Sequence, residues 1–432
     1  MGVIINPVKI LVNTVDAWSG QVGSDTMSSL LSSFDSKDVA SINIRARKSD
    51  STVAGSYFHI LEGRVIKSIF RPSSETGEKY LPQSGAENGE ELAQETRLYR
   101  KRRLLNRYVY VLVREILWKL GHWRSRALDE YVSSFAPDVF FFPIESYIHF
   151  NRINLYIIRK FKPKRIVGYM WDDNFTYKQE PRNPLFLLHR WWLRKSVKRL
   201  VDSCDTVFAI CPKMKRELDA EFGINSVLLT KPVRSEGVKI NPSPSAPIRI
   251  LYTGKLIIGR DETLALVADA IKSINKEGKK VILDIYTSTP LSAKMKARLD
   301  VPGSSNLKGF IPQSEVFKEQ EKADILLFVE SLNPRNGIAR LSFSSNITDL
   351  LSAGKCIWAV GHEGLGPIEY LKQEKAAWVS ISMNDIQNHL LQLLSSPDTM
   401  SVYAQSAQSC GHRNHSVNMK NRFRDILQRE IL

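Results

Sequence analysis

The sequence predicts an α/β protein of two domains, each built on a doubly wound parallel sheet covered by helices. The chain has 432 residues, which exceeds what one hydrophobic core usually organises, so two domains are the default expectation. Strand-like apolar runs alternate with helical segments in both halves, as is typical of parallel sheets. Between the halves, KPVRSEGVKINPSPSAP is rich in Pro and Ser and lacks apolar periodicity. Such a composition is typical of a linker.

In the first half, the run KILVNTV from Lys9 predicts a buried strand, followed by a glycine loop and a helix. Apolar residues then recur at helical spacing at Leu105, Val109, Leu112, Ile116 and Leu120. They predict an amphipathic helix whose other face is basic. Next come the strands in APDVFFFPIES and FKPKRIVGYMWDD, the basic aromatic helix HRWWLRKSVKRL, and the strand, turn and helix of DTVFAICPKMKRELDAEFG.

A fresh alternation begins at Ile248. The apolar runs in RILYTGKL, VILDIYTS, NLKGFIP, ADILLFVES and GKCIWAVG predict strands, and the segments between them predict helices. The segment MKNRFRDILQREIL predicts a last helix. We therefore expect a first domain over 1–234, a linker over 235–247, a second domain over 248–412 and a C-terminal helix over 413–432.

The formal net charge of +16 is the unusual property of the composition, and it predicts an anionic partner. Nucleotide phosphates, anionic lipid and nucleic acid all carry such charge. No RNA- or DNA-binding module is recognisable in the sequence, so we expect no nucleic-acid partner. Much of the excess charge lies in the stretch from Arg97 to Arg126, which contains ten cations and the single acid Glu115.

Other features bear on the location of the protein. No apolar run approaches the ~18–20 residues that span a bilayer, and the start MGVIINPVKILVNTVDAW reads as a first strand, with no signal-peptide pattern. The cysteines, Cys204, Cys211, Cys356 and Cys410, show no disulfide framework, which is consistent with a reducing cytoplasm. No His, Asp, Glu or Cys set has metal-ligand spacing, so we expect neither a metal nor another cofactor.

Ligands of doubly wound sheets bind beyond the carboxyl ends of the strands, so the loops there are the candidate sites. In YTGKLIIGRDETL, Gly254 and Gly259 frame Lys255 and Arg260 at the end of the second half's first strand. Two cations beside a glycine turn and a helix start suit a pyrophosphate. An ordinary solvated basic loop is the alternative.

A second candidate is SSNITDLLSAGK, which places Ser345 and Asn346 at a helix start and Asp349 within the helix. The hydroxyl and N–H groups can face phosphates while the carboxylate faces ribose hydroxyls. An amphipathic helix with an exposed aspartate is the alternative.

The first half offers two weaker candidates. Gly20 and Gly23 follow the first strand and would let a substrate approach the backbone, although a plain turn fits equally well. Asp172 and Asp173, in WDDNFTY, follow the strand RIVGYM. As catalytic residues, they could accept a proton from a substrate hydroxyl or orient it. The same pair could cap a turn.

Taken together, the blocks from Ile248 to about Ser380 resemble the C-terminal domain of GT-B glycosyltransferases, especially the retaining group that builds bacterial surface polysaccharides and glycolipids. The matching blocks are YTGKLIIGRDETL, NLKGFIPQSEVFKEQEKADILLF and SSNITDLLSAGKCIWAV, and the last helix resembles one that crosses back to the first domain. The resemblance implies two Rossmann-like domains facing a central cleft. It further implies that Lys255 and Arg260 hold the donor diphosphate, that Ser345 and Asn346 approach the phosphates, and that Asp349 contacts the ribose.

The activity implied is transfer of a sugar from a nucleotide-diphosphate sugar to a glycan or lipid-linked acceptor, as in capsule or lipopolysaccharide synthesis, without a metal and with retention of configuration. The sequence departs from the family in one respect. Many members carry two glutamates around the acidic helix, whereas here only Asp349 matches and Glu330 comes too early. A GT-B epimerase and a catalytically degenerate basic binding protein are the alternatives.

The helix over 98–120 and HRWWLRKSVKRL combine cations with aromatic residues, as helices that lie in a membrane interface do. We expect tryptophans at the headgroup level and cations against anionic lipid: Trp118, Trp123, Trp191 and Trp192, with Arg102, Arg103, Arg107, Arg194 and Lys195. The protein would then be peripheral on the inner face of the cell membrane. Alternatively, the apolar positions face the domain core and the cations are merely solvated.

Overall fold

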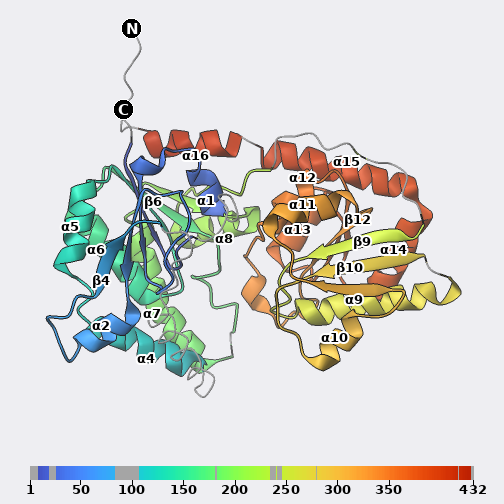
Figure 1. Ribbon diagram of the computed structural model, residues 1–432, viewed down its shortest axis with the longest axis horizontal. Coiled ribbons are helices and arrows are strands. Elements are labelled where there is room, and N and C mark those ends of the chain that lie inside the picture. Colours follow the sequence, from blue (N-terminus) through green and yellow to red (C-terminus); the bar gives the residue numbers. More distant parts are fainter. Residues whose placement is uncertain are drawn as a thin grey trace, which may run out of the picture. The chain divides into compact units, whose positions relative to one another are not determined.

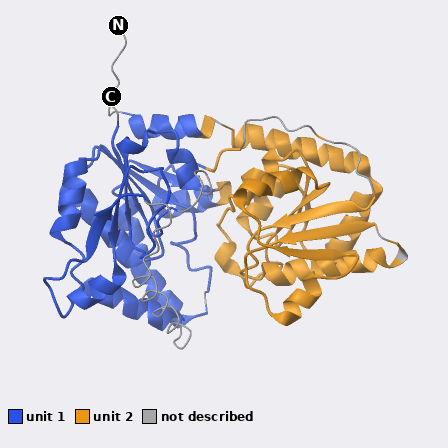
Figure 2. Cartoon of the chain, viewed as in Figure 1, with its two compact units in different colours: residues 1–210, 214–229, 420–432 blue, residues 211–213, 230–419 orange. Residues whose placement is uncertain are grey.

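The computed structural model describes residues 8–18, 26–82, 107–180, 182–233, 240, 246–278, 280–416 and 418–429. The chain forms two compact units (Figure 2), one of Met1–Ile210, Met214–Leu229 and Lys420–Leu432, the other of Cys211–Lys213 and Thr230–Met419. Most of the expected linker, 235–247, lies outside the described residues. The expected domain boundaries therefore stay a prediction.

Unit 1 is built on an eight-stranded sheet of order β4-β3-β2-β1-β5-β6-β7-β8 (Figure 1). All neighbouring strands run parallel except β3 and β4. The strands are β1 (Ile10–Thr14), β2 (Val39–Asn43), β3 (Ser56–Ile60), β4 (Gly77–Tyr80), β5 (Val139–Pro143), β6 (Arg165–Met170), β7 (Thr206–Ala209) and β8 (Val227–Leu228). The chain leaves β1 on one side and returns at β5 on the other, which makes the carboxyl ends of β1 and β5 a topological switch point.

The helices of unit 1 are α1 (Thr26–Leu31), α2 (Glu62–Ser68), α4 (Arg107–Leu120), α5 (Arg126–Phe135), α6 (Ile148–Phe161), α7 (Pro184–Val201) and α8 (Pro212–Phe222), with a 3₁₀ turn η1 (Ser36–Asp38). The last helix, α16 (Asn418–Gln428), also packs here. Its fully buried Phe423 contacts the rings of Phe141 and Phe208 in the sheet. The apolar run of β5, buried along its whole length, is typical of a central parallel strand.

Unit 2 is a six-stranded, entirely parallel sheet of order β11-β10-β9-β12-β13-β14. Its strands are β9 (Ile248–Thr253), β10 (Val281–Tyr286), β11 (Ser305–Gly309), β12 (Ile325–Val329), β13 (Cys356–Val360) and β14 (Trp378–Ser380). Its helices are α9 (Arg260–Ile274), α10 (Ala293–Leu299), α11 (Gln313–Glu321), α12 (Asn346–Ser352), α13 (Gly366–Gln373), α14 (Met383–Ser395) and α15 (Pro397–Asn414), with 3₁₀ turns η3 (Asn275–Glu277) and η4 (Gly337–Ala339). The switch point of this sheet lies between β9 and β12.

The tryptophans expected at a membrane interface require a correction. Trp118 is fully buried and Trp123 is 5% exposed, so neither can sit among lipid headgroups. Trp118 instead stacks on His149 with ring centroids 4.5 Å apart. Trp191 is 53% exposed and fits the expectation, whereas Arg102 and Arg103 lie outside the described residues. None of the helices that the structure describes has the length and apolar character needed to cross a bilayer.

Candidate functional site

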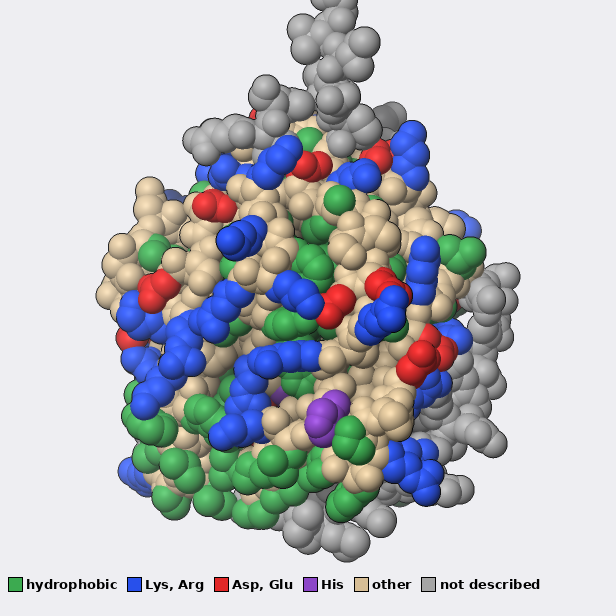
Figure 3. Space-filling view, turned by 90° about the vertical axis from the view of Figure 1, so that its left-hand side faces the viewer, with side chains coloured by type: hydrophobic (Ala, Val, Ile, Leu, Met, Phe, Trp, Pro, Cys, Tyr) green, Lys and Arg blue, Asp and Glu red, His purple; other side chains and the backbone are tan. Residues whose placement is uncertain are grey.

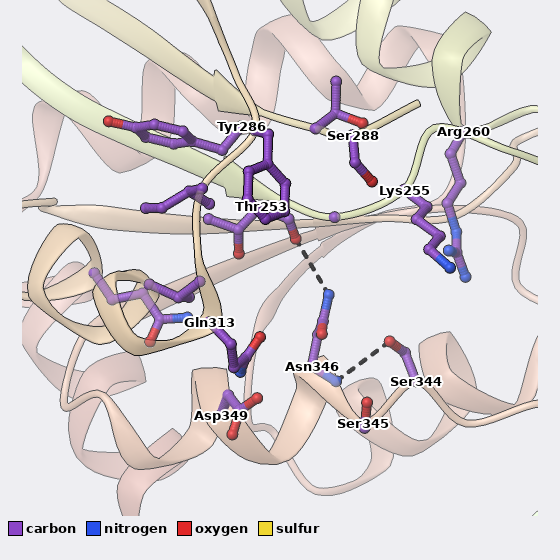
Figure 4. A pocket seen from close by; sticks show the side chains of 16 residues that line it. Thr253, Lys255, Arg260, Tyr286, Ser288, Gln313, Ser344, Ser345, Asn346 and Asp349 are labelled. Atoms are coloured by element: carbon purple, nitrogen blue, oxygen red, sulfur yellow. Dashed lines mark hydrogen bonds between the residues drawn. The ribbon is translucent and has the colours of Figure 1, made fainter. Parts of the chain in front are cut away.

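A pocket of about 320 Å³ lies in unit 2 at the carboxyl ends of β9, β10 and β11 and beside the start of α12 (Figure 4). Doubly wound sheets place ligands at this edge. The pocket brings together six of the expected binding residues and several that were not expected. Its lining includes Thr253, Gly254, Lys255, Arg260, Tyr286, Ser288, Phe310, Gln313, Ser344, Ser345, Asn346 and Asp349.

Gly259 shapes the turn that carries the two cations. It is the residue before α9, with φ of 77°, a backbone conformation that favours glycine. A Cβ atom here would lie 2.3 Å from Asn336 Nδ2 and 2.7 Å from Ser331 Oγ. Asn336 Nδ2 donates a hydrogen bond to that hydroxyl at 2.8 Å, so the neighbours are themselves held in place. The second glycine of the motif is therefore required by both the turn and its packing.

Arg260 begins α9 and forms a two-pronged ion pair with Glu330, which follows β12. Nε donates to Oε2 at 2.9 Å and Nη2 to Oε1 at 2.6 Å. Glu330 is only 2% exposed, and burial raises the pKa of its carboxyl, against the lowering effect of Arg260. Arg260, which was expected to hold a diphosphate, is thus already paired with a carboxylate that the sequence did not connect with it. The guanidinium still lines the pocket, where its remaining Nη1 edge can bind an anion.

Lys255 differs from Arg260 in having no ion-pair partner among the described residues. Its side chain is exposed, and Figure 4 shows it running alongside that of Arg260. The loop below it is held in place: Tyr252 Oη donates to the Lys255 carbonyl at 3.2 Å, and the Leu256 N–H donates to Thr289 Oγ1 at 2.9 Å. An ammonium group on a rigid loop in an open pocket is well placed for a phosphate.

The start of α12 is tied to the end of β9. Asn346 Nδ2 donates to the Thr253 carbonyl at 3.2 Å, and its backbone N–H donates to Ser344 Oγ at 3.3 Å (Figure 4). Asp349, one turn further, accepts two hydrogen bonds from Lys231 Nζ at 2.9 and 3.0 Å. Lys231 is 118 residues away in sequence, so no spacing pattern reveals this pair. The lysine holds the carboxylate in place at the wall of the pocket that it lines.

Phe310, directly after β11, is one of the pocket residues that sequence reasoning missed. It is 72% exposed, so its ring is accessible to a planar ligand. Tyr286 and Gln313 also line the pocket. The glycine-aromatic pair in NLKGF was the only available signal.

In unit 1, Asp172 and Asp173 follow β6 but occupy different environments. Asp173 is fully buried and accepts hydrogen bonds from the Thr176 N–H at 3.0 Å and from Thr176 Oγ1 at 2.5 Å. Its carboxylate caps a turn, which is the alternative that the sequence left open, and a substrate hydroxyl has no access to it. Asp172 is exposed.

A carboxyl that sequence reasoning missed, Glu145, follows β5. Burial, and then the negative charge of Asp172, raise its pKa to about 8 from the ordinary 4.5. Asp16, which follows β1, adds to this effect. Because β1, β5 and β6 are neighbours, these acids share one edge of the sheet. Gly20 and Gly23, also expected here, lie outside the described residues, and the described part of the chain contains no group of His, Cys, Asp and Glu arranged to hold a metal.

No protein-family model and no curated protein matches this chain. Several solved structures do match it. Anabaena Alr3699/HepE, solved with UDP, has a TM-score of 0.61 at 10% identity over 97% of this chain and 99% of its own. The UDP-forming α,α-trehalose-phosphate synthase of Burkholderia vietnamiensis has a TM-score of 0.55 at 8% identity, over 97% and 99%.

Staphylococcus aureus TarM, solved with UDP and α-GlcNAc-glycerol, has a TM-score of 0.50 at 10% identity. This match covers 69% of the present chain and 58% of TarM, so the chain spans little more than half of that protein. Identities this low establish the fold alone. Two parallel-dominated α/β units and full-length similarity to these glycosyltransferases show that the chain has the two-domain, Rossmann-like GT-B fold.

Proposed function

We propose that this protein is a glycosyltransferase that binds a nucleotide-diphosphate sugar in the pocket of unit 2. The observation that carries the proposal is Lys255, which has no ion-pair partner in the described part of the chain and lies beside Arg260 at the switch point of the sheet. A pair of cations in this place stabilises the negative charge that grows on the departing diphosphate. Asp349 accepts hydrogen bonds from the ribose hydroxyls, and Phe310 stacks on the base.

UDP is the nucleotide we favour. HepE and TarM were solved with UDP, and the B. vietnamiensis synthase is UDP-forming. The similarity of HepE and of the synthase to this chain extends over the unit that holds the pocket. A uracil base and a diphosphate need an aromatic surface at one end and cations at the other, and Phe310 and Lys255 supply these two features.

We assign acceptor binding to unit 1. In transfer, the bond between the anomeric carbon and the diphosphate oxygen breaks, a bond to the acceptor oxygen forms, and the proton of the acceptor hydroxyl passes to an oxygen of the departing diphosphate. Asp172 is an exposed carboxylate at the carboxyl edge of unit 1 and is suited to orient that hydroxyl. The acceptor we propose is a glycan or a lipid-linked sugar of a bacterial surface polysaccharide, such as capsule or lipopolysaccharide. The protein would act on the inner face of the cell membrane.

Two mechanistic features complete the proposal. Transfer needs no divalent metal, because Lys255 and Arg260 supply the positive charge that Mg²⁺ or Mn²⁺ supplies in other transferases. Transfer retains the anomeric configuration. This feature follows from the resemblance to the retaining group alone.

The test is an assay of UDP-, GDP- and ADP-sugars with lipid-linked and soluble acceptors, followed by proton NMR of the product. We expect nucleotide release and a glycoside of retained configuration, with full activity in EDTA. Isomerisation of the donor sugar without transfer would instead indicate an epimerase. Absence of turnover and of binding by every nucleotide sugar would contradict the proposal.

A further inference from the structure

Helix α4 exposes an apolar face, whereas an ordinary surface helix buries its apolar face. Val109, Val113, Ile116 and Leu120, hereafter the α4 stripe, are 36%, 47%, 50% and 56% exposed. Their spacing of four, three and four residues places them on one face of the helix. The opposite face buries two charged residues, Arg114 and Glu115, which are 6% and 1% exposed.

This arrangement is built into the fold, because each buried charge has dedicated partners. Arg114 Nε donates to both carboxylate oxygens of Glu62 on α2, at 2.8 and 3.0 Å. Glu115 accepts from the backbone N–H groups of Ile148 and His149 at the start of α6, at 2.9 and 2.8 Å. Burying charges while exposing aliphatic side chains is costly in water. The arrangement therefore indicates that the α4 stripe meets something other than water.

The charge around the stripe indicates what it meets. Glu115 is the only acid of α4, and α7 contains none. The exposed charged residues of these two helices are all cations: Arg107, Lys119, Lys195, Lys198 and Arg199. Lys119 lies between Ile116 and Leu120 on the exposed side of α4. Two of these cations already face an acid, Arg107 with Glu180 at 3.7 Å and Lys198 with Asp202 at 2.9 Å. An exposed aliphatic stripe whose own helix exposes cations and no acid matches an anionic lipid surface.

The neighbouring elements extend the apolar surface. Phe70, just beyond the end of α2, is 84% exposed and is followed by exposed Arg71. The end of α2 adjoins the end of α4, where the His122 N–H donates to Ser68 Oγ at 2.8 Å. Figure 3 shows hydrophobic side chains gathered at the end of unit 1 where α2 and α4 lie in Figure 1, with Lys and Arg side chains above them.

We propose that the α4 stripe and Phe70 insert into the headgroup region of an anionic bilayer, with the flanking cations binding lipid phosphates. A second copy of the chain is a poorer occupant, because its net charge of +16 would repel an equally basic surface. The proposal deepens the proposed function, since it rests on a lipid-linked acceptor for its biological purpose. Its physical basis does not depend on that acceptor.

The test is sedimentation of the full chain with vesicles of phosphatidylglycerol and phosphatidylcholine, and with phosphatidylcholine alone, at ~50 mM and ~0.5 M salt. The test variant is Val113→Asp/Ile116→Asp. The matched control is Met383→Asp/Val402→Asp, which places the same charges on exposed apolar positions of unit 2, 61% and 60% exposed in the wild type. Binding of UDP in solution is measured on all proteins.

We expect the wild type and the control to bind phosphatidylglycerol vesicles at low salt and to bind neutral vesicles weakly. The test variant should bind at least tenfold less, because two carboxylates are repelled by anionic lipid. Its UDP binding should be unchanged, so that failure of the membrane proposal and failure of the proposed function remain distinguishable. Its melting temperature should shift by less than about 2 °C, as for substitutions at exposed positions.

Three results would overturn the proposal. Equal vesicle binding by the test variant and the control would show that the stripe is not the docking surface. A large fall in the melting temperature of the test variant would show that another part of this chain covers the stripe. A wild-type dimer in sedimentation velocity that the substitutions dissociate would assign the stripe to a second copy.

Discussion

In both units, loops at the carboxyl ends of the strands form one edge of the sheet, and this edge is cationic in unit 2 but acidic in unit 1. At the switch point of unit 2, the end of β9 presents Lys255 and Arg260 around a polar pocket. At the switch point of unit 1, the ends of β1, β5 and β6 carry Asp16, Glu145 and Asp172. The cationic edge attracts a diphosphate, whereas the acidic edge repels one and is suited to a neutral, hydroxyl-rich molecule. In the function that we propose, this contrast assigns the donor to unit 2 and the acceptor to unit 1.

Within the cationic edge, the two basic residues have different tasks. Arg260 is bound to a buried carboxylate, and Lys255 is bound to none among the described residues. Stability should therefore depend on the arginine and diphosphate binding mainly on the lysine. From the sequence alone the two residues could not be distinguished, because both are cations near a glycine turn.

The largest expected effect is the loss of stability on Arg260→Ala. The substitution leaves Glu330 buried without its partner, which should lower the free energy of unfolding by about 3–5 kcal/mol. Chemical denaturation monitored by circular dichroism measures this change. The double variant Arg260→Ala/Glu330→Gln should recover most of the loss, because a neutral amide removes the unpaired charge. An unchanged midpoint for the single variant would show that the ion pair is unimportant.

Lys255→Ala should leave the melting temperature unchanged, because the side chain is exposed and forms no ion pair with any residue that the structure describes. Transfer, measured as kcat/KM for the donor, should fall by roughly 10- to 1,000-fold, as on removal of a contact to a developing anion. Lys322→Ala, another exposed lysine of unit 2, is the control. Normal kcat/KM in Lys255→Ala would place the diphosphate elsewhere.

Glu145 gives the acidic edge a signature in pH. Its folded-state pKa of about 8 lies above the ordinary 4.5, so between these values the folded protein holds a proton that the unfolded chain has released. Stability should then fall as pH rises through this window. Relative to wild type, Glu145→Gln should gain about 1–3 kcal/mol between pH 5 and pH 8. A difference in unfolding free energy between the two proteins that stays constant from pH 5 to pH 8 would refute the assignment.

The smallest expected effect is that of Phe310→Ala. Loss of an exposed ring that stacks on a base should weaken UDP binding by about 1 kcal/mol, or roughly fivefold, with little change in stability. Phe310→Trp should preserve binding. If the two variants bind UDP equally well, the base lies on another wall of the pocket.

The sequence predicted the elements of unit 2 well because each is local. Alternating apolar runs identified its sheet, and the glycine turn placed Lys255 and Arg260 in the pocket. It failed wherever a partner lies far along the chain. Glu330 is 70 residues from Arg260, and Lys231 is 118 residues from Asp349, so neither pair can be read from spacing.

Helix α4 shows a different limit of sequence reasoning. Its periodicity correctly indicated a helix with an apolar face, but periodicity does not say which face is buried. Here Glu62 and His149 hold Arg114 and Glu115 in the interior, and this arrangement turned the apolar face outward. Trp118, expected at the surface, is buried for the same reason.

We propose that the pocket of unit 2 binds a nucleoside diphosphate through Lys255. Isothermal titration calorimetry with UDP and with uridine, on the wild type and on Lys255→Ala, measures this contact. Lys255→Ala should bind UDP at least tenfold more weakly than the wild type, whereas both proteins should bind uridine equally. Equal UDP affinity of the two proteins, or no UDP binding by either, would overturn the proposal.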